Sequence, residues 1–197
     1  MAFSGLILLG TLILTLPAVT ADGKGTSFVN ALFTATSAVT VTGLSTVDTE
    51  FHWNVYGHWV IAILIQIGGF GIVGFATLLG YLVDGRISLS SRASARAEAT
   101  VSGNPDVRKL ITSILKMMLF FEALLFAFLF YRFFTEYDYD FQDAVGHGAF
   151  HAISAFNNAG FALYSDSLMS FARDGWIIIP IFVGAFMGSL GFPVLSE

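Results

Sequence analysis

The sequence predicts an all-α membrane protein made of two M1–P-loop–M2 repeats. In each repeat, M1 and M2 are membrane-spanning helices, and the P-loop between them is a short helix with the loop that follows it. The chain would thus have four transmembrane helices plus two re-entrant pore helices. Composition is the first reason, because 55% of the 197 residues are hydrophobic and only 12% are charged, about half the charged fraction of soluble domains. Four long apolar segments are the second reason, since such segments are typical of helices that cross a bilayer. A short internal repeat, written once in each half of the chain, is the third.

The first half of the chain gives one unit. An apolar segment covers residues 3–20 and ends near Pro17. A polar turn follows, and residues 27–39 then have apolar positions at helical spacing, with Ser27 as a helix N-cap. This helix is too short to span a bilayer. Residues 56–83 form the second apolar span, with a glycine-rich middle that allows close helix packing.

The second half repeats this order after a hydrophilic stretch. Residues 110–134 are apolar, residues 144–156 form a short helix, and residues 176–195 are apolar again. We therefore divide the chain into a first repeat (1–83), a linker (84–109) and a second repeat (110–197). The linker holds five of the nine basic residues, namely Arg86, Arg92, Arg96, Arg108 and Lys109.

The distribution of charge predicts orientation. Basic loops remain in the cytoplasm, so we expect the linker and both termini to be cytoplasmic and both short helices to enter the membrane from outside. Nine of the fourteen acidic residues then lie on the outer side. Asp48 and Asp166 each follow a short helix, and we expect them to form an acidic outer vestibule that concentrates cations.

The internal repeat identifies the candidate site. Residues 33–43 align without gaps to residues 150–160, with Phe, Ala, Ser, Ala and Gly at the same positions. A short helix cannot end in lipid, where its terminal carbonyls lack partners, but it can end at a pore axis where a cation satisfies them. The candidate cation-filter residues are Thr40, Val41, Thr42, Gly43, Asn157, Asn158, Ala159 and Gly160.

Plainer interpretations of these residues exist. Either glycine alone is more often a helix C-cap, and only the repeat favours a filter. The threonines can bond back to helix carbonyls, although we favour roles lining or supporting the filter. We favour Asn158 at the filter, and the role of Asn157 stays open. Glu122 lies in the middle of an apolar span, so we expect it to be functional or paired, with a partner that the sequence does not identify.

Other classes of function are less well supported. The chain has no cysteine, which excludes disulfides and thiolate chemistry, and its net charge of −5 gives no basis for nucleic-acid binding. His147 and His151 have a spacing that can hold zinc, so an intramembrane zinc metalloenzyme is the alternative; Gly148 stands where a zincin helix has glutamate. We favour packing for both histidines and expect no enzyme activity.

Several motifs resemble one transporter family. TSAVTVTGL (36–44) and HAISAFNNAGF (151–161) resemble the first two pore loops of the Trk/Ktr/HKT potassium transporters. LIQIGGFGI (64–72) and GFPV (191–194) resemble the helices that follow those loops, and DGRISL (84–89) resembles the start of the linker. The likeness covers nearly the whole chain and is greatest to the bacterial Ktr-type ion-translocating subunit.

The resemblance implies potassium uptake across the bacterial inner membrane by a multi-pass protein surrounded by lipid. Four repeats would surround one filter, with Gly43 and Gly160 as two of its four glycines and with filter carbonyls at about 41–43 and 158–160. It also implies a homodimer, a cytoplasmic nucleotide-binding regulatory ring, and Na⁺ as a candidate coupling ion beside K⁺. Because this chain has two of the four repeats, we expect it to form half of a pore. We favour a fragment of a longer chain over a chain that pairs with a second copy to close the pore. A non-conducting fragment or assembly module is a further alternative.

Overall fold

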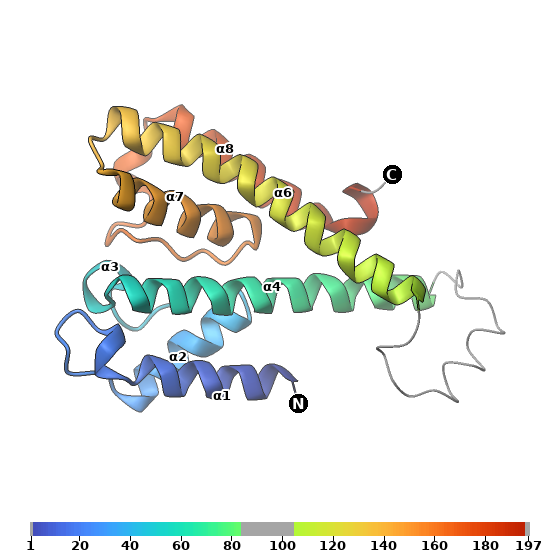
Figure 1. Cartoon of the computed structure of the whole chain (residues 1–197), viewed down its shortest axis with the longest axis horizontal. Helices are drawn as coiled ribbons and strands as arrows, with labels where there is room; N and C mark the ends of the chain where they lie inside the picture. Colours follow the sequence, from blue (N-terminus) through green and yellow to red (C-terminus); the bar gives the residue numbers. More distant parts are fainter. Residues whose placement is uncertain (1, 84–104, 196–197) are drawn as a thin grey trace.

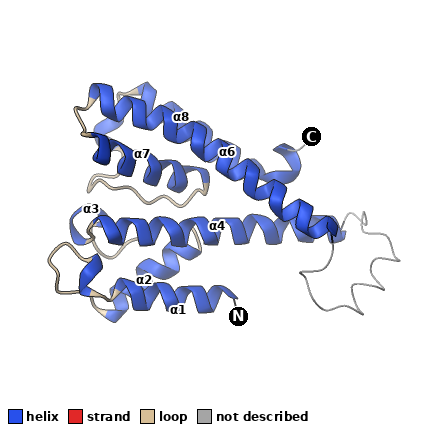
Figure 2. Ribbon diagram, in the orientation of Figure 1, coloured by secondary structure: helices blue, strands red, loops and turns tan. Residues whose placement is uncertain are grey.

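The structure is a computed structural model that describes the backbone of residues 2–83 and 105–195, and most side chains between residues 3–75 and 109–190. All the named elements in these ranges are helices (Figure 2). In order, they are α1 (Ala2–Leu14), the 3₁₀ helix η1 (Pro17–Val19), α2 (Phe28–Val39), α3 (Thr49–His52), α4 (Val55–Val83), α6 (Pro105–Glu136), α7 (Phe141–Phe156), the 3₁₀ helix η2 (Met169–Phe171) and α8 (Gly175–Leu195).

The helices form two groups that meet at α4. Helices α1 and α2 pack together and against α4, while α7 and α8 pack against α6. Helix α7 also contacts α4, so the two short helices, α2 and α7, lie on either side of it (Figure 1). The segment that follows α7 runs back between α7 and α4. Both short helices end near the middle of the molecule.

Two helices are long and apolar enough to cross a membrane, over Val55–Phe75 of α4 and Ile111–Glu136 of α6. Their large apolar side chains are widely exposed, as at Phe75 and Phe120, which is typical of a surface that contacts lipid. The other two predicted spans correspond to the shorter apolar helices Phe3–Leu14 and Gly175–Leu190.

Two helices have ends that differ from the limits of the apolar segments, for local reasons. Helix α1 ends at Leu14, well before residue 20, because Pro17 cannot continue it and opens the 3₁₀ helix η1 instead. Helix α6 begins at Pro105, with proline in the first turn, where its missing N–H costs nothing. Arg108 and Lys109 therefore lie on α6, and the rest of the predicted linker, residues 84–104, lies outside the described residues.

The short helices are set by their N-caps. The Ser27 hydroxyl accepts a hydrogen bond of 3.2 Å from the N–H of Asn30, as predicted. The Asp140 carboxylate does the same for the N–H of Asp143 at 2.8 Å. Because Asp140 caps the helix, α7 begins at Phe141, three residues before the predicted start. With 12 and 16 residues, neither short helix is long enough to span a bilayer.

Candidate functional site

Each short helix ends in the same turn. We call residues 40–43 the first turn and residues 157–160 the second turn. The N–H of Thr42 donates to the carbonyl of Ser37 at 2.9 Å, and the N–H of Ala159 donates to the carbonyl of Ser154 at 2.8 Å. The preceding bonds also match, from Val41 to Ala38 (3.2 Å) and from Asn158 to Ala155 (3.0 Å). The aligned sequences thus adopt one backbone fold, although only one of the four turn residues is identical.

Both turns use left-handed backbone conformations at the same two positions. The φ angles are +48° at Val41 and +56° at Asn158, then +76° at Gly43 and +73° at Gly160. Glycine and, less readily, asparagine adopt such angles, but for a β-branched valine they are costly by about 1–3 kcal/mol. Backbone strain of this kind persists where the surrounding contacts fix the chain and is frequent at functional sites.

A buried serine closes each turn. The N–H of Leu44, the residue after the first glycine, donates to the Ser37 hydroxyl at 2.9 Å. In the second turn the Ser154 hydroxyl donates to the carbonyl of Phe161 at 2.6 Å. The direction of the bond is reversed, but the same pair of positions is joined. No role for these serines was predicted from the sequence, although Ser37 and Ser154 match in the repeat.

The two turns meet at their glycines. A β-carbon added to Gly43 would overlap the carbonyl oxygen of Ala159 and lie 3.1 Å from the α-carbon of Gly160. A β-carbon added to Gly160 would lie 3.4 Å from the α-carbon of Gly43. The two backbones therefore approach each other as closely as glycine allows, and the two halves of the chain contribute to one site.

Glycines of the long helices receive the ends of the short ones. A β-carbon on Gly68 of α4 would overlap the carbonyl oxygen of Val39, the last residue of α2. A β-carbon on Gly188 of α8 would overlap the carbonyl oxygen of Phe156, the last residue of α7. The same contact thus occurs in both halves of the chain, and it explains why each long helix has glycine at this level.

A hollow of about 220 Å³ opens beside the two glycines. Asp48 lines it, and the Asp48 carboxylate accepts hydrogen bonds from the N–H groups of Glu50 and Phe51 and from the Ser165 hydroxyl. The bond from Ser165, more than the backbone bonds, lowers the pKa of Asp48 below its usual range. Asp166 is not among the lining residues; its carboxylate accepts from the N–H of Ser170 at 2.9 Å.

The side chains of the second turn bond to neighbouring helices. Asn157, 9% exposed, donates to Gln66 of α4 at 3.1 Å and to Glu122 of α6 at 3.0 Å. Asn158 donates to the carbonyl of Ala185 on α8 at 3.0 Å and accepts from Ser189 at 3.2 Å. Asn157 and Gln66 are thus partners of Glu122 that the sequence analysis could not name.

The threonine side chains of the first turn bond locally. The hydroxyl of Thr40 lies 2.7 Å from the carbonyl oxygen of Thr36, which is the back-bonding alternative, and 2.6 Å from the hydroxyl of Thr42. Both threonines are exposed. The first turn is therefore held within its own repeat.

The structure does not support the zinc alternative. His151 is buried, and both of its ring nitrogens have partners: Nδ1 lies 2.7 Å from the carbonyl oxygen of His147, and Nε2 accepts from the N–H of Leu163 at 3.3 Å. No lone pair of His151 is left for a metal. Among the described residues, no three His, Asp or Glu side chains are grouped closely enough to hold a metal ion.

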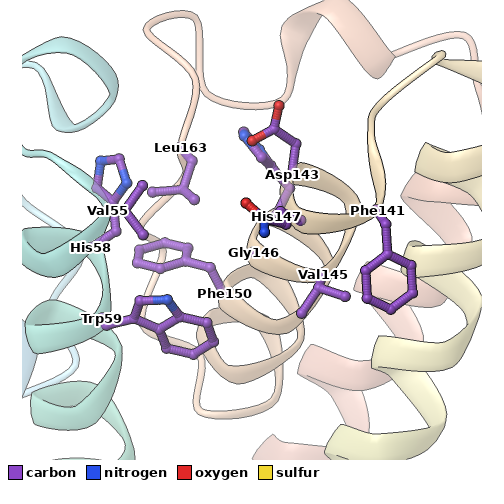
Figure 3. A pocket seen from close by; sticks show the side chains of 11 residues that line it. Val55, His58, Trp59, Phe141, Asp143, Val145, Gly146, His147, Phe150 and Leu163 are labelled. Carbon is purple, nitrogen blue, oxygen red and sulfur yellow. The ribbon is translucent and has the colours of Figure 1, made fainter.

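His147 lines a separate pocket of about 440 Å³ between α4 and α7 (Figure 3). Its ring stacks against His151 of the same helix, lies beside Tyr164, and meets the ring of Phe133 on α6 edge to face. In Figure 3, His58 and Trp59 approach from α4, while Asp143 and His147 come from α7. His147 is therefore part of an aromatic contact between helices, in agreement with packing.

Long helices with exposed apolar faces, and two short helices that end in facing glycine turns, define a helical membrane protein. Over residues 6–197 the chain matches the TrkH family model, described as "Cation transport protein". The chain therefore belongs to the TrkH family of cation transport proteins.

Curated relatives agree with this family. The chain is 40% identical over its whole length to the Ktr system potassium uptake protein B of Vibrio alginolyticus. It is 38% identical over 97% of its length to the Ktr system potassium uptake protein B of Bacillus subtilis, and 37% identical over 98% to the potassium/sodium uptake protein NtpJ of Enterococcus hirae. The chain spans 42% of the length of each of these three relatives.

Proposed function

We propose that this chain forms half of a four-repeat pore that takes up K⁺ through a filter of backbone carbonyls. The observation that carries the proposal is the pair of equivalent turns that meet at Gly43 and Gly160. The filter residues are those of the first and second turns, and the transported ion is K⁺. Relatives named as potassium uptake proteins support the choice of ion.

The electrostatics of the turns favour a cation. Helices α2 and α7 are the two re-entrant pore helices, and the negative ends of their dipoles lie at the turns. Carbonyls that no helix partner satisfies can replace the hydration shell of an alkali ion. Asp48 beside the glycines raises the cation concentration at the outer mouth, and Asp166 contributes at longer range.

The proposed pore also has a defined arrangement in the membrane. Residues 1–83 and 110–197 each form one M1–P–M2 repeat, in the bacterial inner membrane, with four spans in all and with residues 84–109, which include the start of α6, and both termini in the cytoplasm. "Ktr system" in the relatives' names supports a regulatory partner, which we propose is a cytoplasmic nucleotide-binding ring on a homodimer. The words "potassium/sodium" in the NtpJ name support Na⁺ as a second ion.

Uptake in cells that lack their own K⁺ systems tests the proposal. Two proteins are expressed separately. One is the chain alone, and the other is the chain fused to the part of the Vibrio alginolyticus relative that lies outside the matched region. We expect the fusion to restore growth on low K⁺ and Gly43→Ala to weaken its discrimination of K⁺ from Na⁺. If the fusion restores uptake and both Gly43→Ala and Gly160→Ala leave its discrimination unchanged, the filter assignment is wrong. Uptake by the chain alone would exclude a non-conducting assembly module.

A further inference from the structure

Three polar side chains meet behind the second turn, each from a different helix or its end. Gln66 lies on α4, Glu122 lies on α6, and Asn157 follows α7 directly. The Asn157 amide donates to Gln66 Oε1 (3.1 Å) and Glu122 Oε1 (3.0 Å), and Gln66 Nε2 donates to Glu122 Oε2 (2.9 Å). We call these three residues the carboxylate network. It joins both halves of the chain at the first residue of the second turn.

Glu122 and Asn157 of the network are buried, and Gln66 is half-buried. Glu122 is 6% exposed, and each of its two carboxylate oxygens accepts one amide hydrogen bond. The ion pairs found among the described residues involve Arg132 and do not include Glu122. A buried carboxylate held by neutral amides is costly when a donor is removed. Its bonds therefore hold the partners firmly in place.

The side chain of Asn157 has little room to move. A β-carbon on Gly69 of α4 would overlap Asn157 Oδ1 and lie 3.1 Å from Asn157 Cβ. The amide nitrogen has three acceptors within hydrogen-bond distance, Gln66 Oε1, Glu122 Oε1 and the carbonyl of Ile153 (2.9 Å), and they share its two hydrogens. A shift of Glu122 or Gln66 is therefore transmitted to Asn157 and then to the backbone of residues 158–160.

We propose that Glu122 and Gln66 are positioning residues that fix the second turn through Asn157 and thereby set the discrimination between K⁺ and Na⁺. This inference rests on the proposed filter function. Binding sites need their groups held within about 0.5 Å of the working geometry, and such precision comes from the hydrogen bonds behind them. Glu122 and Gln66 act through Asn157 and are not assigned contact with the ion.

The first turn provides an internal comparison. Thr40 occupies the position that aligns with Asn157, and its hydroxyl bonds to Thr36 and Thr42 within the same repeat. The carboxylate network therefore holds the second turn only. Loss of the network should loosen residues 158–161 and leave residues 41–44 unchanged.

Amide hydrogen exchange tests the positioning directly and does not require transport. The purified chain in lipid nanodiscs is compared with Glu122→Ala and Gln66→Ala. We expect exchange at residues 158–161 to accelerate about tenfold, the effect of losing a hydrogen bond to a charged group, with little change at residues 41–44. Equal exchange at residues 158–161 in the wild type and in folded variants would overturn the proposal.

A swap of the two side chains keeps the test valid if single variants fold poorly. Gln66→Glu combined with Glu122→Gln rebuilds the same bonds with the charge on the other helix. We expect the swap to restore slow exchange at residues 158–161. The matched control is Asp174→Asn, which disrupts an ion pair of 2.9 Å with Arg132 between α6 and the start of α8; the side-chain partners of Asp174 are Arg132, Tyr137 and the N–H of Trp176, none of them in the turns. Asp174→Asn should lower thermal stability and leave exchange at residues 158–161 unchanged.

Transport through the fusion described above gives the functional arm. We expect Glu122→Gln and Gln66→Leu each to lower the K⁺/Na⁺ uptake ratio about tenfold at equal membrane protein, and the swap to recover most of it. If Gly43→Ala lowers the ratio and neither single variant does, the positioning role is wrong and the filter stands. If none of these three substitutions changes the ratio, and Gly160→Ala does not change it either, the filter function itself is wrong.

Discussion

Gly43→Ala and Gly160→Ala are expected to have unequal effects, and the structure gives the order. Both glycines have positive φ, so alanine costs about 1–2 kcal/mol at either position from the backbone alone. At Gly43 the new methyl group would also overlap the Ala159 carbonyl oxygen and lie 3.1 Å from Gly160 Cα. At Gly160 the methyl group would meet only Gly43 Cα, at an ordinary 3.4 Å.

The magnitude follows from these contacts. The backbone cost corresponds to about tenfold in an equilibrium constant, because 1.4 kcal/mol is a factor of ten. The overlap with the Ala159 carbonyl adds to this at Gly43 and displaces the very atom that we assign to the ion. We therefore expect Gly160→Ala to lower the K⁺/Na⁺ uptake ratio about tenfold, and Gly43→Ala to lower it further.

The assay is competitive uptake of K⁺ and Na⁺ by the fusion at equal protein in the membrane. Gly23→Ala is the matched control, since Gly23 also has positive φ (+65°) but no described atom lies within 4 Å of its added β-carbon. This control should lose stability without a change in the ion ratio. A larger effect at Gly160 than at Gly43, or the same effect in the control, would refute the reasoning.

Four further predictions concern the support of the turns and the hollow beside them. Gly68→Ala and Gly188→Ala would each force a methyl group onto the last carbonyl of a short helix, so both should lower the apparent Tm of the detergent-solubilised chain by several degrees, whereas Gly74→Ala, which has no described atom within 4 Å of its added methyl group, should not. Ser37→Ala leaves the Leu44 N–H without its acceptor and should cost about 1–3 kcal/mol, measured by thermal unfolding; a change below the error of the scan would contradict the role of Ser37. Asp48→Asn should raise the apparent KM for K⁺ about twofold at low ionic strength and have little effect at 1 M salt; an equal effect at both would exclude a charge mechanism. Because the folded-state pKa of Asp48 is lowered, its charge persists below its ordinary value near 3.8, and Ser165→Ala should move the loss of that charge to higher pH in a titration of the Asp48 carboxyl.

The sequence predicted the class of fold well, because helix content and caps are local properties. Apolar composition and the Ser27 cap were sufficient for the long helices and for α2. The ungapped repeat aligned Gly43 with Gly160 correctly, since both have the same positive φ. Helix boundaries were less accurate where one residue decides them, as Pro17 and Asp140 do.

The contacts behind the turns were beyond the sequence. Glu122 and Asn157 are 35 residues apart, and Gln66 and Asn157 are 91 residues apart, so no local pattern joins them. Their meeting depends on how α4, α6 and α7 pack, which is a tertiary property. The opposite directions of the Ser37 and Ser154 hydrogen bonds could not be predicted from the sequence either. A hydroxyl can donate or accept, and only the fold decides which.

The most direct test of the central claim is to locate the ion. We propose diffraction from the uptake-competent fusion soaked in Tl⁺, a K⁺ substitute whose anomalous signal identifies it, with a Na⁺ soak as the comparison. The account predicts a Tl⁺ peak between the first and second turns, coordinated by carbonyl oxygens of residues 41–43 and 158–160, and its loss in Gly43→Ala. Ordered Tl⁺ elsewhere in the membrane region, with none between Gly43 and Gly160, would contradict it.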